Sequence, residues 1–208
     1  MGGTLARGYA GVNVAAQRHH MRVTSGKFGG RTLVAPADMR VRPTSDKVRQ
    51  AVFNILEHRD FANGFELENA AVIDLFAGTG ALGIEALSRG AKFCLFVDDD
   101  AESRGLQRQN VETLGLTGIS KIWRRDATDL GPLNTGSGGP FNLAFLDPPY
   151  RKGLAEKCLA SLTAGGWLAD DAVIVAETAV DETLAADGFT ILDERDYGAA
   201  RVRFLVRA

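Results

Sequence analysis

After Asn63-Gly64, short apolar segments alternate with helical patterns to the end of the chain. The apolar segments are rich in β-branched and aromatic residues and are bounded by turn residues, which is typical of buried strands. We expect strands at residues 71–76, 93–98, 119–124, 141–147, 172–177, 190–196 and 201–206. We expect helices at residues 81–89, 101–114, 154–162 and 181–186.

The first five strands are separated by helices, which predicts a mostly parallel, doubly wound α/β sheet of the Rossmann-like type. Only a tight Tyr197-Gly198 turn separates the last two strands. A parallel crossover needs about a dozen residues, so these two strands should form an antiparallel hairpin at the end of the sheet. The glycine-rich residues 134–140 are expected to be a loop.

A different pattern precedes this core. Residues 22–35 predict a short β-hairpin that turns at residues 28–31. Thr44 is a plausible N-cap for the helix that follows. The apolar face of that helix repeats with helical spacing at Val48, Ala51, Val52, Ile55 and Leu56.

These patterns divide the chain into three parts. Residues 1–20 are a Gly- and Ala-rich tail without the apolar core of a secretory signal, consistent with an upstream start or a cloning remnant. A weakly arginine-rich targeting peptide is the alternative. Residues 21–60 form a basic hairpin-helix extension, and residues 61–208 form the α/β core.

Composition excludes several classes of protein. Hydrophobic residues make up 45% of the 208 residues and charged residues 24%, so the chain is not disordered throughout. No apolar run approaches the roughly 18 residues that a membrane span needs. Cys94 and Cys158 stand alone in apolar surroundings, which predicts buried free thiols and a cytoplasmic location. No Cys/His ligand spacing is present, so we expect no metal site, and no pattern indicates self-association, so we expect a monomer.

The net charge of −2 hides an uneven distribution. Residues 1–59 carry ten Lys and Arg but three acidic residues, whereas the remainder carries 14 basic and 23 acidic residues. A basic front on an acidic body suggests a polyanionic partner, and a solvated charged arm is the alternative. The residues expected to contact this partner, which would be RNA if the resemblance described below holds, are Arg22, Arg40, Arg42, Thr44 and Arg49.

A glycine motif lies between the first core strand and the next helix. Gly78, Gly80 and Gly83 have the spacing G-x-G-x-x-G, which allows a tight turn and brings the backbone close to a ligand at the helix N-terminus. Asp98 is the first carboxylate at the end of the second strand, where it could accept from ribose hydroxyls. We expect Asp100 to cap the following helix. The cofactor-binding segment would also include Phe76, Ala77 and Thr79.

Two further acidic residues indicate which ligand the glycine motif binds. Asp74 precedes the motif by four positions and would repel a diphosphate, but it suits a cationic ligand such as S-adenosylmethionine. Asp126-Ala127 follows the third strand, where an acid could accept from an adenine amino group. Asp74 could instead cap the turn, and Asp126 a short helix.

The fourth strand ends in Asp147-Pro148-Pro149-Tyr150, beside the glycine motif in an open sheet. An Asp147 oxygen and the Pro148 carbonyl could grip the two N–H bonds of an exocyclic amino group and turn its lone pair toward a methyl donor. Pro149 stiffens the segment and would contact RNA, and Tyr150 offers a flat face for an extruded base. An ordinary Asp-Pro turn with a packed Tyr is the alternative.

These residues resemble a class I S-adenosylmethionine-dependent methyltransferase with the (Asp/Asn)-Pro-Pro-(Tyr/Phe) signature of amino-group methylators. More narrowly, residues 21–207 are similar to the bacterial small-subunit (16S) rRNA guanine-N2 methyltransferases. The most specific stretches are 42–49, 53–54, 74–90, 147–150 and 165–168.

The resemblance implies a seven-stranded sheet, S-adenosylmethionine as donor, and a guanine in rRNA or in the small-subunit particle as acceptor. It also implies that residues 42–44 lie over cofactor and substrate, so that the extension 21–60 would be a lid over RNA and cofactor and residues 61–208 the catalytic core. Asp98 departs from the family, which often has Glu there. The competing hypotheses are an N6-adenine methyltransferase acting on DNA or other RNA, a small-molecule methyltransferase and a non-catalytic RNA-binding protein.

Overall fold

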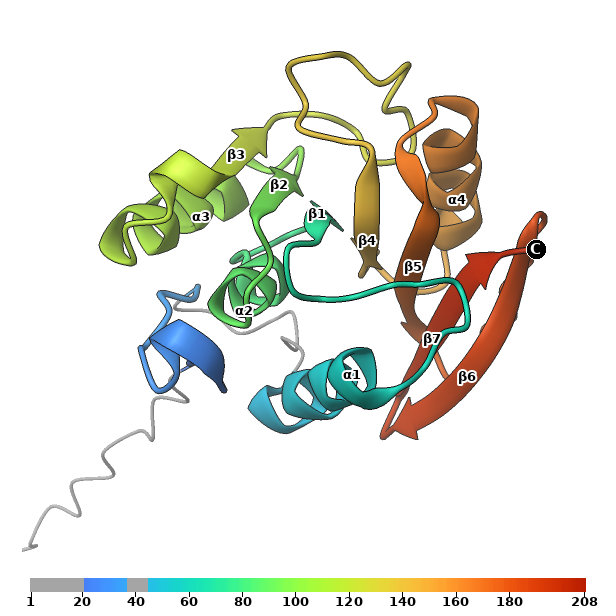
Figure 1. The fold of residues 1–208 in the computed structure, drawn as a ribbon, viewed down its shortest axis with the longest axis horizontal. Helices are drawn as coiled ribbons and strands as arrows, with labels where there is room; N and C mark the ends of the chain where they lie inside the picture. The colour runs from blue at the N-terminus through green and yellow to red at the C-terminus, as the bar shows by residue number, and fades with distance from the viewer. Residues whose placement is uncertain (1–20, 37–44) are drawn as a thin grey trace, which may run out of the picture.

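The computed structural model describes residues 21–36 and 45–208 (Figure 1). Its centre is a seven-stranded sheet in the order β3-β2-β1-β4-β5-β7-β6. The strands are β1 (Ala71–Leu75), β2 (Phe93–Val97), β3 (Ser120–Trp123), β4 (Phe141–Leu146), β5 (Leu168–Ala179), β6 (Phe189–Tyr197) and β7 (Ala200–Arg207). The α-helices are α1 (Asp46–His58), α2 (Ala81–Ser88), α3 (Ala101–Thr113) and α4 (Leu154–Ala164).

The predicted topology is confirmed. Strands β1 to β5 are parallel, and β7 pairs antiparallel with both β5 and β6. The chain direction changes there because only Gly198 and Ala199 lie between β6 and β7, too few residues for a parallel crossover.

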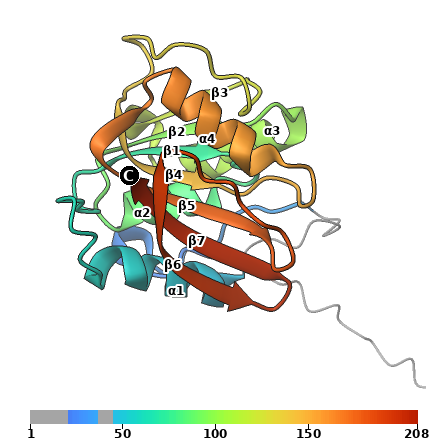
Figure 2. The same cartoon turned by 90° about the vertical axis from the view of Figure 1, so that its right-hand side faces the viewer.

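Alternating side chains of the strands divide the core into two clusters. One face of the sheet packs against the N-terminal segment 21–36 and helices α1, α2 and α3. The other face packs against α4 and the loop between β3 and β4. Figure 2 shows α4 and α1 on opposite sides of the sheet. Asp74 is the polar residue of β1, and it lies on the α2 face.

The predicted N-terminal hairpin is present. Residues 22–35 pair antiparallel at the bridge Arg22–Thr32, with Val23 N–H donating to the Arg31 carbonyl at 2.9 Å, around a 3-10 turn at Gly26–Phe28. Two local predictions were wrong. Residues 181–186 are not helical; Glu182 N–H donates to the Ala179 carbonyl in a turn, and the six-residue segment is too short to form a stable helix alone. Ser45, not Thr44, caps α1, since its side chain accepts from Val48 N–H.

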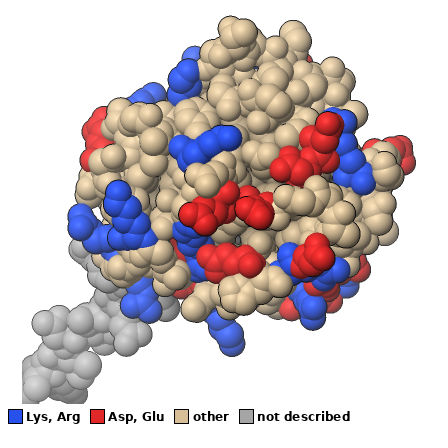
Figure 3. Space-filling view, in the orientation of Figure 1, with Lys and Arg blue, Asp and Glu red and all other residues tan. Residues whose placement is uncertain are grey.

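The N-terminal segment and α1 pack into the main core. Met21, Val23 and Leu33 are buried beside α1 residues such as Phe53. Arg22, Lys27 and Arg31 on the same segment are exposed. The segment therefore has an apolar inner side and a cationic outer side. On the face shown in Figure 3, basic side chains lie at the lower left, several acidic ones lie near the centre, and groups of both signs are mixed toward the right.

Cys94 and Cys158 are buried free thiols, as predicted. Within residues 21–36 and 45–208, no helix has the length and apolar character to cross a membrane. The same residues contain no group of three or more His, Cys, Asp or Glu side chains arranged to hold a metal ion.

Candidate active site

The glycine motif makes a sharp turn between β1 and α2. Phe76 has φ +58°, Gly78 +53° and Gly80 +80°, so three residues of the turn adopt a left-handed backbone. That conformation is costly for Phe76 and free of strain for glycine. A strained non-glycine residue directly after a buried strand is a feature of functional sites.

Gly83 allows α2 to lie close to β2. A Cβ atom at this position would collide with the Phe96 ring and with Cys94 Sγ. The backbone therefore approaches the sheet more closely than any larger residue would permit. The third glycine of the motif serves packing, and the first two serve the turn.

Two carboxylates hold this turn through backbone N–H groups. Asp74 Oδ2 accepts from Gly83 N–H at 2.9 Å, and Asp98 Oδ2 accepts from Gly78 N–H at 2.8 Å. Asp98 Oδ1 also accepts from Asp100 N–H at 2.9 Å. Asp100 in turn caps α3, as predicted, by accepting from Ser103 N–H. The acid at the end of β2 is thus built into the glycine loop.

Burial changes the acidity of both carboxyl groups. Burial raises the pKa of Asp74 to about 7; the nearby charge of Asp98 adds to this, and the bond from Gly83 opposes it. The pKa of Asp98 is also raised by burial, against the bonds from Asp100 and Gly78. A cation bound above the loop would favour the ionised form of Asp74 and lower its pKa.

Helix α3 supports the loop from the other side. Gln107 Nε2 donates to the Gly78 carbonyl at 3.0 Å, and Asn110 Nδ2 donates to the Thr79 carbonyl at 3.0 Å. Both side chains are buried. Sequence reasoning missed both residues, although each is a polar position on the inner side of the predicted helix.

These residues fit S-adenosylmethionine. A Cβ atom at Gly78 would have no neighbour closer than the Phe76 carbonyl oxygen at 3.9 Å, so the loop is open on its outer side. Asp98 is half-exposed beside this opening. Asp126 follows the neighbouring strand β3 and is exposed; its Oδ1 accepts from the N–H and hydroxyl of Thr128. Ala127, next to Asp126, is buried.

The second motif begins next to the first. Leu75, the last residue of β1, pairs with Leu146, the last residue of β4. Phe76 and Asp147 therefore leave the sheet from neighbouring positions at the same edge. Asp147 is half-exposed, Pro148 is buried and Pro149 is exposed. The two motifs predicted from separate parts of the sequence are brought together.

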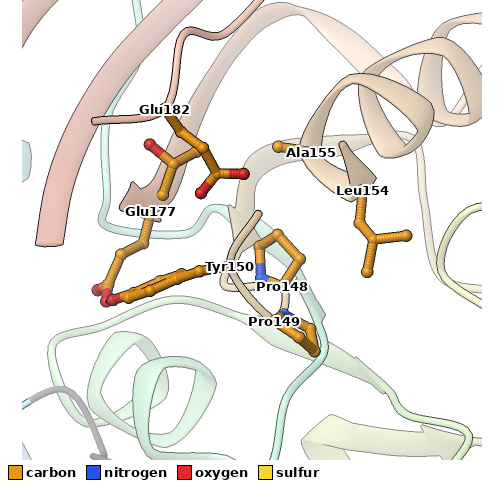
Figure 4. A pocket seen from close by; sticks show the side chains of 8 residues that line it. Pro148, Pro149, Tyr150, Leu154, Ala155, Glu177 and Glu182 are labelled. Carbon is orange, nitrogen blue, oxygen red and sulfur yellow. The ribbon is translucent and has the colours of Figure 1, made fainter. Parts of the chain in front are cut away.

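Tyr150 is held by a carboxylate from the next strand. Its hydroxyl donates to Glu177 Oε1 on β5, and the ring is half-buried. Figure 4 shows the two side chains meeting at their tips, with Pro148 and Pro149 alongside, at the edge of a small pocket that Glu182 also lines. The hydroxyl contact fixes the direction of the aromatic ring.

Hydrogen bonds and an ion pair hold the residues after Tyr150 in the same region. Glu182 Oε1 accepts from Arg151 N–H at 2.7 Å, and Glu182 Oε2 accepts from Ala179 N–H at 2.9 Å. Arg151 also forms an ion pair with Asp181. Sequence reasoning missed Glu177 and Glu182; an acid at the end of the fifth predicted strand was the available signal for Glu177.

A buried carboxylate on α2 anchors the N-terminal segment. The two oxygens of Glu85 accept from Thr24 N–H and Ser25 N–H, at 2.7 and 3.0 Å, and from the Thr24 hydroxyl. Arg89 donates to the same carboxylate at 2.8 Å, and Arg49 lies 3.4 Å from it. Glu85 and Arg49 are completely buried.

The residues predicted to contact RNA have different positions. The Arg22 side chain is 65% exposed and pairs with Asp46. Arg49 is buried, where it donates to the Arg22 carbonyl and to Asp46, so its place is inside the fold and not on an RNA-binding surface. Arg40, Arg42 and Thr44 lie outside the described residues.

The chain matches one family model and several known proteins. Residues 21–206 match the model of a family described as "Conserved hypothetical protein 95". The chain is 39% identical to the Bacillus subtilis protein YlbH over 76% of this chain and 82% of that protein. It is 35% identical to the Ribosomal RNA small subunit methyltransferase D of Escherichia coli over 79% of this chain and 77% of the enzyme.

A solved structure extends the match. The structure of yhhF from Escherichia coli aligns with a TM-score of 0.73 and 33% identity, covering 90% of this chain and 98% of that one. The chain therefore belongs to the conserved hypothetical protein 95 family, together with bacterial small-subunit rRNA methyltransferases.

Proposed function

We propose that this protein transfers a methyl group from S-adenosylmethionine to the exocyclic N2 amino group of a guanine in small-subunit rRNA. The observation that carries the proposal is the pairing of Leu75 with Leu146, which sets the glycine loop beside Asp147-Pro148-Pro149-Tyr150. The relatives that are named as small-subunit rRNA methyltransferases support the substrate class. Such a substrate would place the enzyme in the cytoplasm.

The cofactor would lie on the glycine loop. When bound, S-adenosylmethionine supplies an electrophilic methyl group on its sulfonium. Asp98 would accept from the ribose hydroxyls, in addition to the two backbone bonds that already fix its direction. Asp126 and Ala127 would lie at the adenine, and the buried charge of Asp74 would favour the cationic end of the ligand.

The acceptor amine would be positioned by the second motif. An amino group conjugated with a base is a poor nucleophile because its lone pair is delocalised into the ring. Asp147 Oδ and the Pro148 carbonyl would accept its two N–H bonds and turn the lone pair toward the methyl group. Positioning of this kind supplies much of the rate, and the surplus proton can leave the cationic methylated amine afterwards.

The base and the RNA backbone would be held separately. Tyr150 would stack on the extruded guanine, with its ring direction fixed by Glu177. Pro149 is exposed beside it. Arg22, Lys27 and Arg31 form the cationic outer side of the N-terminal segment and would contact phosphates, as would Arg40, Arg42 and Thr44.

A methyl-transfer assay with isotopically labelled S-adenosylmethionine tests the proposal. Unmodified small-subunit rRNA, partly assembled small subunits and unmethylated DNA are offered separately, and the products are identified by nucleoside mass spectrometry. Labelled N2-methylguanosine is the expected product. Label in N6-methyladenosine would support the same transfer mechanism, but with adenine and not guanine as the acceptor. The absence of label with intact cofactor binding would contradict the proposal and favour a small-molecule acceptor or a non-catalytic role.

A further inference from the structure

Asn110 joins two parts of the molecule that are far apart in sequence. Its Oδ1 accepts from Val34 N–H at 2.7 Å, and its Nδ2 donates to the Val34 carbonyl at 3.1 Å and to the Thr79 carbonyl at 3.0 Å. The side chain is 2% exposed. To Val34 it presents the same donor and acceptor pair that a neighbouring strand would.

A second contact runs between the same two parts. The Thr79 hydroxyl donates to Met21 Sδ at 3.3 Å. Met21 and Val34 stand at opposite ends of the described part of the N-terminal segment, 21–36. The segment therefore touches the glycine loop near both of its ends, once directly and once through Asn110.

Gln107, one turn before Asn110 on α3, shows that this network is incomplete. Its Nε2 donates to the Gly78 carbonyl, but its Oε1 has no hydrogen-bond partner among the described residues although the side chain is completely buried. An unsatisfied buried acceptor destabilises the arrangement that holds it. Two amides one turn apart on α3 thus hold two successive carbonyls of the glycine loop, at Gly78 and Thr79.

We propose that Asn110 is a positioning residue that couples cofactor binding on the glycine loop to docking of the N-terminal segment, so that cofactor and RNA bind with positive cooperativity. This inference rests on the proposed function, because it takes S-adenosylmethionine as the ligand of the loop and RNA phosphates as the partner of Arg22, Lys27 and Arg31.

The physical basis is a shared set of hydrogen bonds. Asn110 makes its three bonds only when Val34 and Thr79 are both in place. A ligand that orders the loop fixes the Thr79 carbonyl and lowers the entropy that the segment loses on docking. Linkage requires the reverse as well: an RNA that holds the segment in its docked position increases cofactor affinity by the same factor.

Hydrogen–deuterium exchange of the full chain tests the coupling, with S-adenosylhomocysteine as the ligand actually added. The measured quantity is the exchange rate of the segment 21–36 without ligand divided by the rate at saturating ligand. We expect a ratio of about ten for the unaltered protein and of less than about two for Asn110→Ala. If Asn110→Ala only destabilised the fold, the exchange rate of segment 21–36 would rise both with and without ligand, and the ratio would stay unchanged.

Two other variants complete the experiment. Gln109→Ala removes an exposed amide from the neighbouring position of α3 and should keep the ratio of the unaltered protein. Met21→Leu conserves volume and removes only the sulfur contact, so it should give an intermediate ratio, and it carries the test if Asn110→Ala does not fold.

The outcomes separate this inference from the proposed function. If the ligand protects the glycine loop but not the segment 21–36, or protects the segment equally in Asn110→Ala, the coupling is refuted and cofactor binding stands. If the ligand does not bind the unaltered protein, the proposed cofactor is wrong and the inference fails with it.

Discussion

The two halves of the candidate site are held in different ways. The cofactor half is the glycine loop at residues 76–80 with the start of α2, and it is fixed by side chains that bind its backbone. Asp98, Gln107 and Asn110 bind the loop itself, and Asp74 binds Gly83 N–H in α2. These supports come from β1, the end of β2 and α3. The acceptor half, Asp147-Pro148-Pro149-Tyr150, is fixed by its own prolines and by Glu177 and Glu182 from the end of β5 and beyond.

The two halves would divide the work of the proposed reaction. In the cofactor half, the backbone of the glycine loop would bind the ligand, and the supporting side chains act on main-chain atoms. In the acceptor half, side chains would perform the chemistry, and the supports act on the side chain of Tyr150 and on the following loop. Damage to one half should therefore leave the other largely intact, and each variant below tests that separation.

Asp147→Ala should have the largest effect. Loss of the oxygen that grips the acceptor amine should lower kcat by about a thousandfold, while cofactor affinity changes by less than about twofold. Asp147→Asn keeps one acceptor oxygen, so its kcat should lie between those of the unaltered protein and Asp147→Ala. Steady-state transfer and calorimetric titration of the cofactor measure the two quantities. A retained kcat with a strongly weakened cofactor affinity would reverse the assignment of the two halves.

Gly80→Val should damage the cofactor half. Gly80 has φ +80°, and a Cβ atom there would lie 3.2 Å from Phe96 Cε1, so the loop must move to accept the side chain. We expect cofactor affinity to fall by about a hundredfold. Gly118→Val is the matched control, because that glycine has open space around it and no positive φ. Normal cofactor affinity in Gly80→Val would show that the loop is not part of the cofactor site.

Asp74→Asn should separate charge from hydrogen bonding in the cofactor half. Because the folded pKa of Asp74 is raised to about 7 from 3.8, its protonated form is favoured by folding. Its contribution to stability is fully present below pH 4 and is lost as the pH rises toward 7. The amide keeps an acceptor for Gly83 N–H and does not titrate.

Between pH 5 and pH 8, the unaltered protein should therefore lose about 2–3 kcal/mol of unfolding free energy relative to Asp74→Asn. Urea unfolding at several pH values measures this. Over the same range the affinity for the cationic cofactor should rise with pH in the unaltered protein and stay flat in the variant. Parallel stability curves would show that Asp74 does not titrate in this range.

Tyr150→Phe should have the smallest effect. It removes the hydroxyl contact with Glu177 but keeps the ring, so kcat/KM for RNA should fall by about tenfold, with cofactor affinity unchanged. Tyr150→Ala also removes the stacking surface, so its kcat/KM for RNA should be lower still. Equal losses in the two variants would show that the hydroxyl, not the ring, carries the role of Tyr150.

Sequence patterns were sufficient for the sheet and for the two motifs at its edge. The parallel direction of the first five strands follows from the helices between them, and the antiparallel hairpin follows from the short turn before the last strand. The G-x-G-x-x-G and Asp-Pro-Pro-Tyr motifs are each contiguous in the chain. Periodicity failed at residues 181–186, where Glu182 binds backbone N–H groups in a turn and no helix forms.

The supporting residues could not be predicted because their partners are set by tertiary packing. Arg49 is in a basic segment, and charge alone placed it on the RNA surface; the fold instead buries it beside Glu85 and Asp46. Glu85 is part of the contiguous stretch 74–90, yet nothing in its neighbours indicates that it binds Thr24 and Ser25 about sixty positions earlier.

A single-turnover experiment tests the central claim most directly. Protein loaded with one equivalent of labelled S-adenosylmethionine is mixed with excess unmodified small-subunit particles, and both bound cofactor and labelled nucleosides are followed. We expect N2-methylguanosine from the unaltered protein, and from Asp147→Ala no product although the cofactor is still bound. Product from Asp147→Ala at the unaltered rate, or label in another nucleoside, would contradict the proposed function.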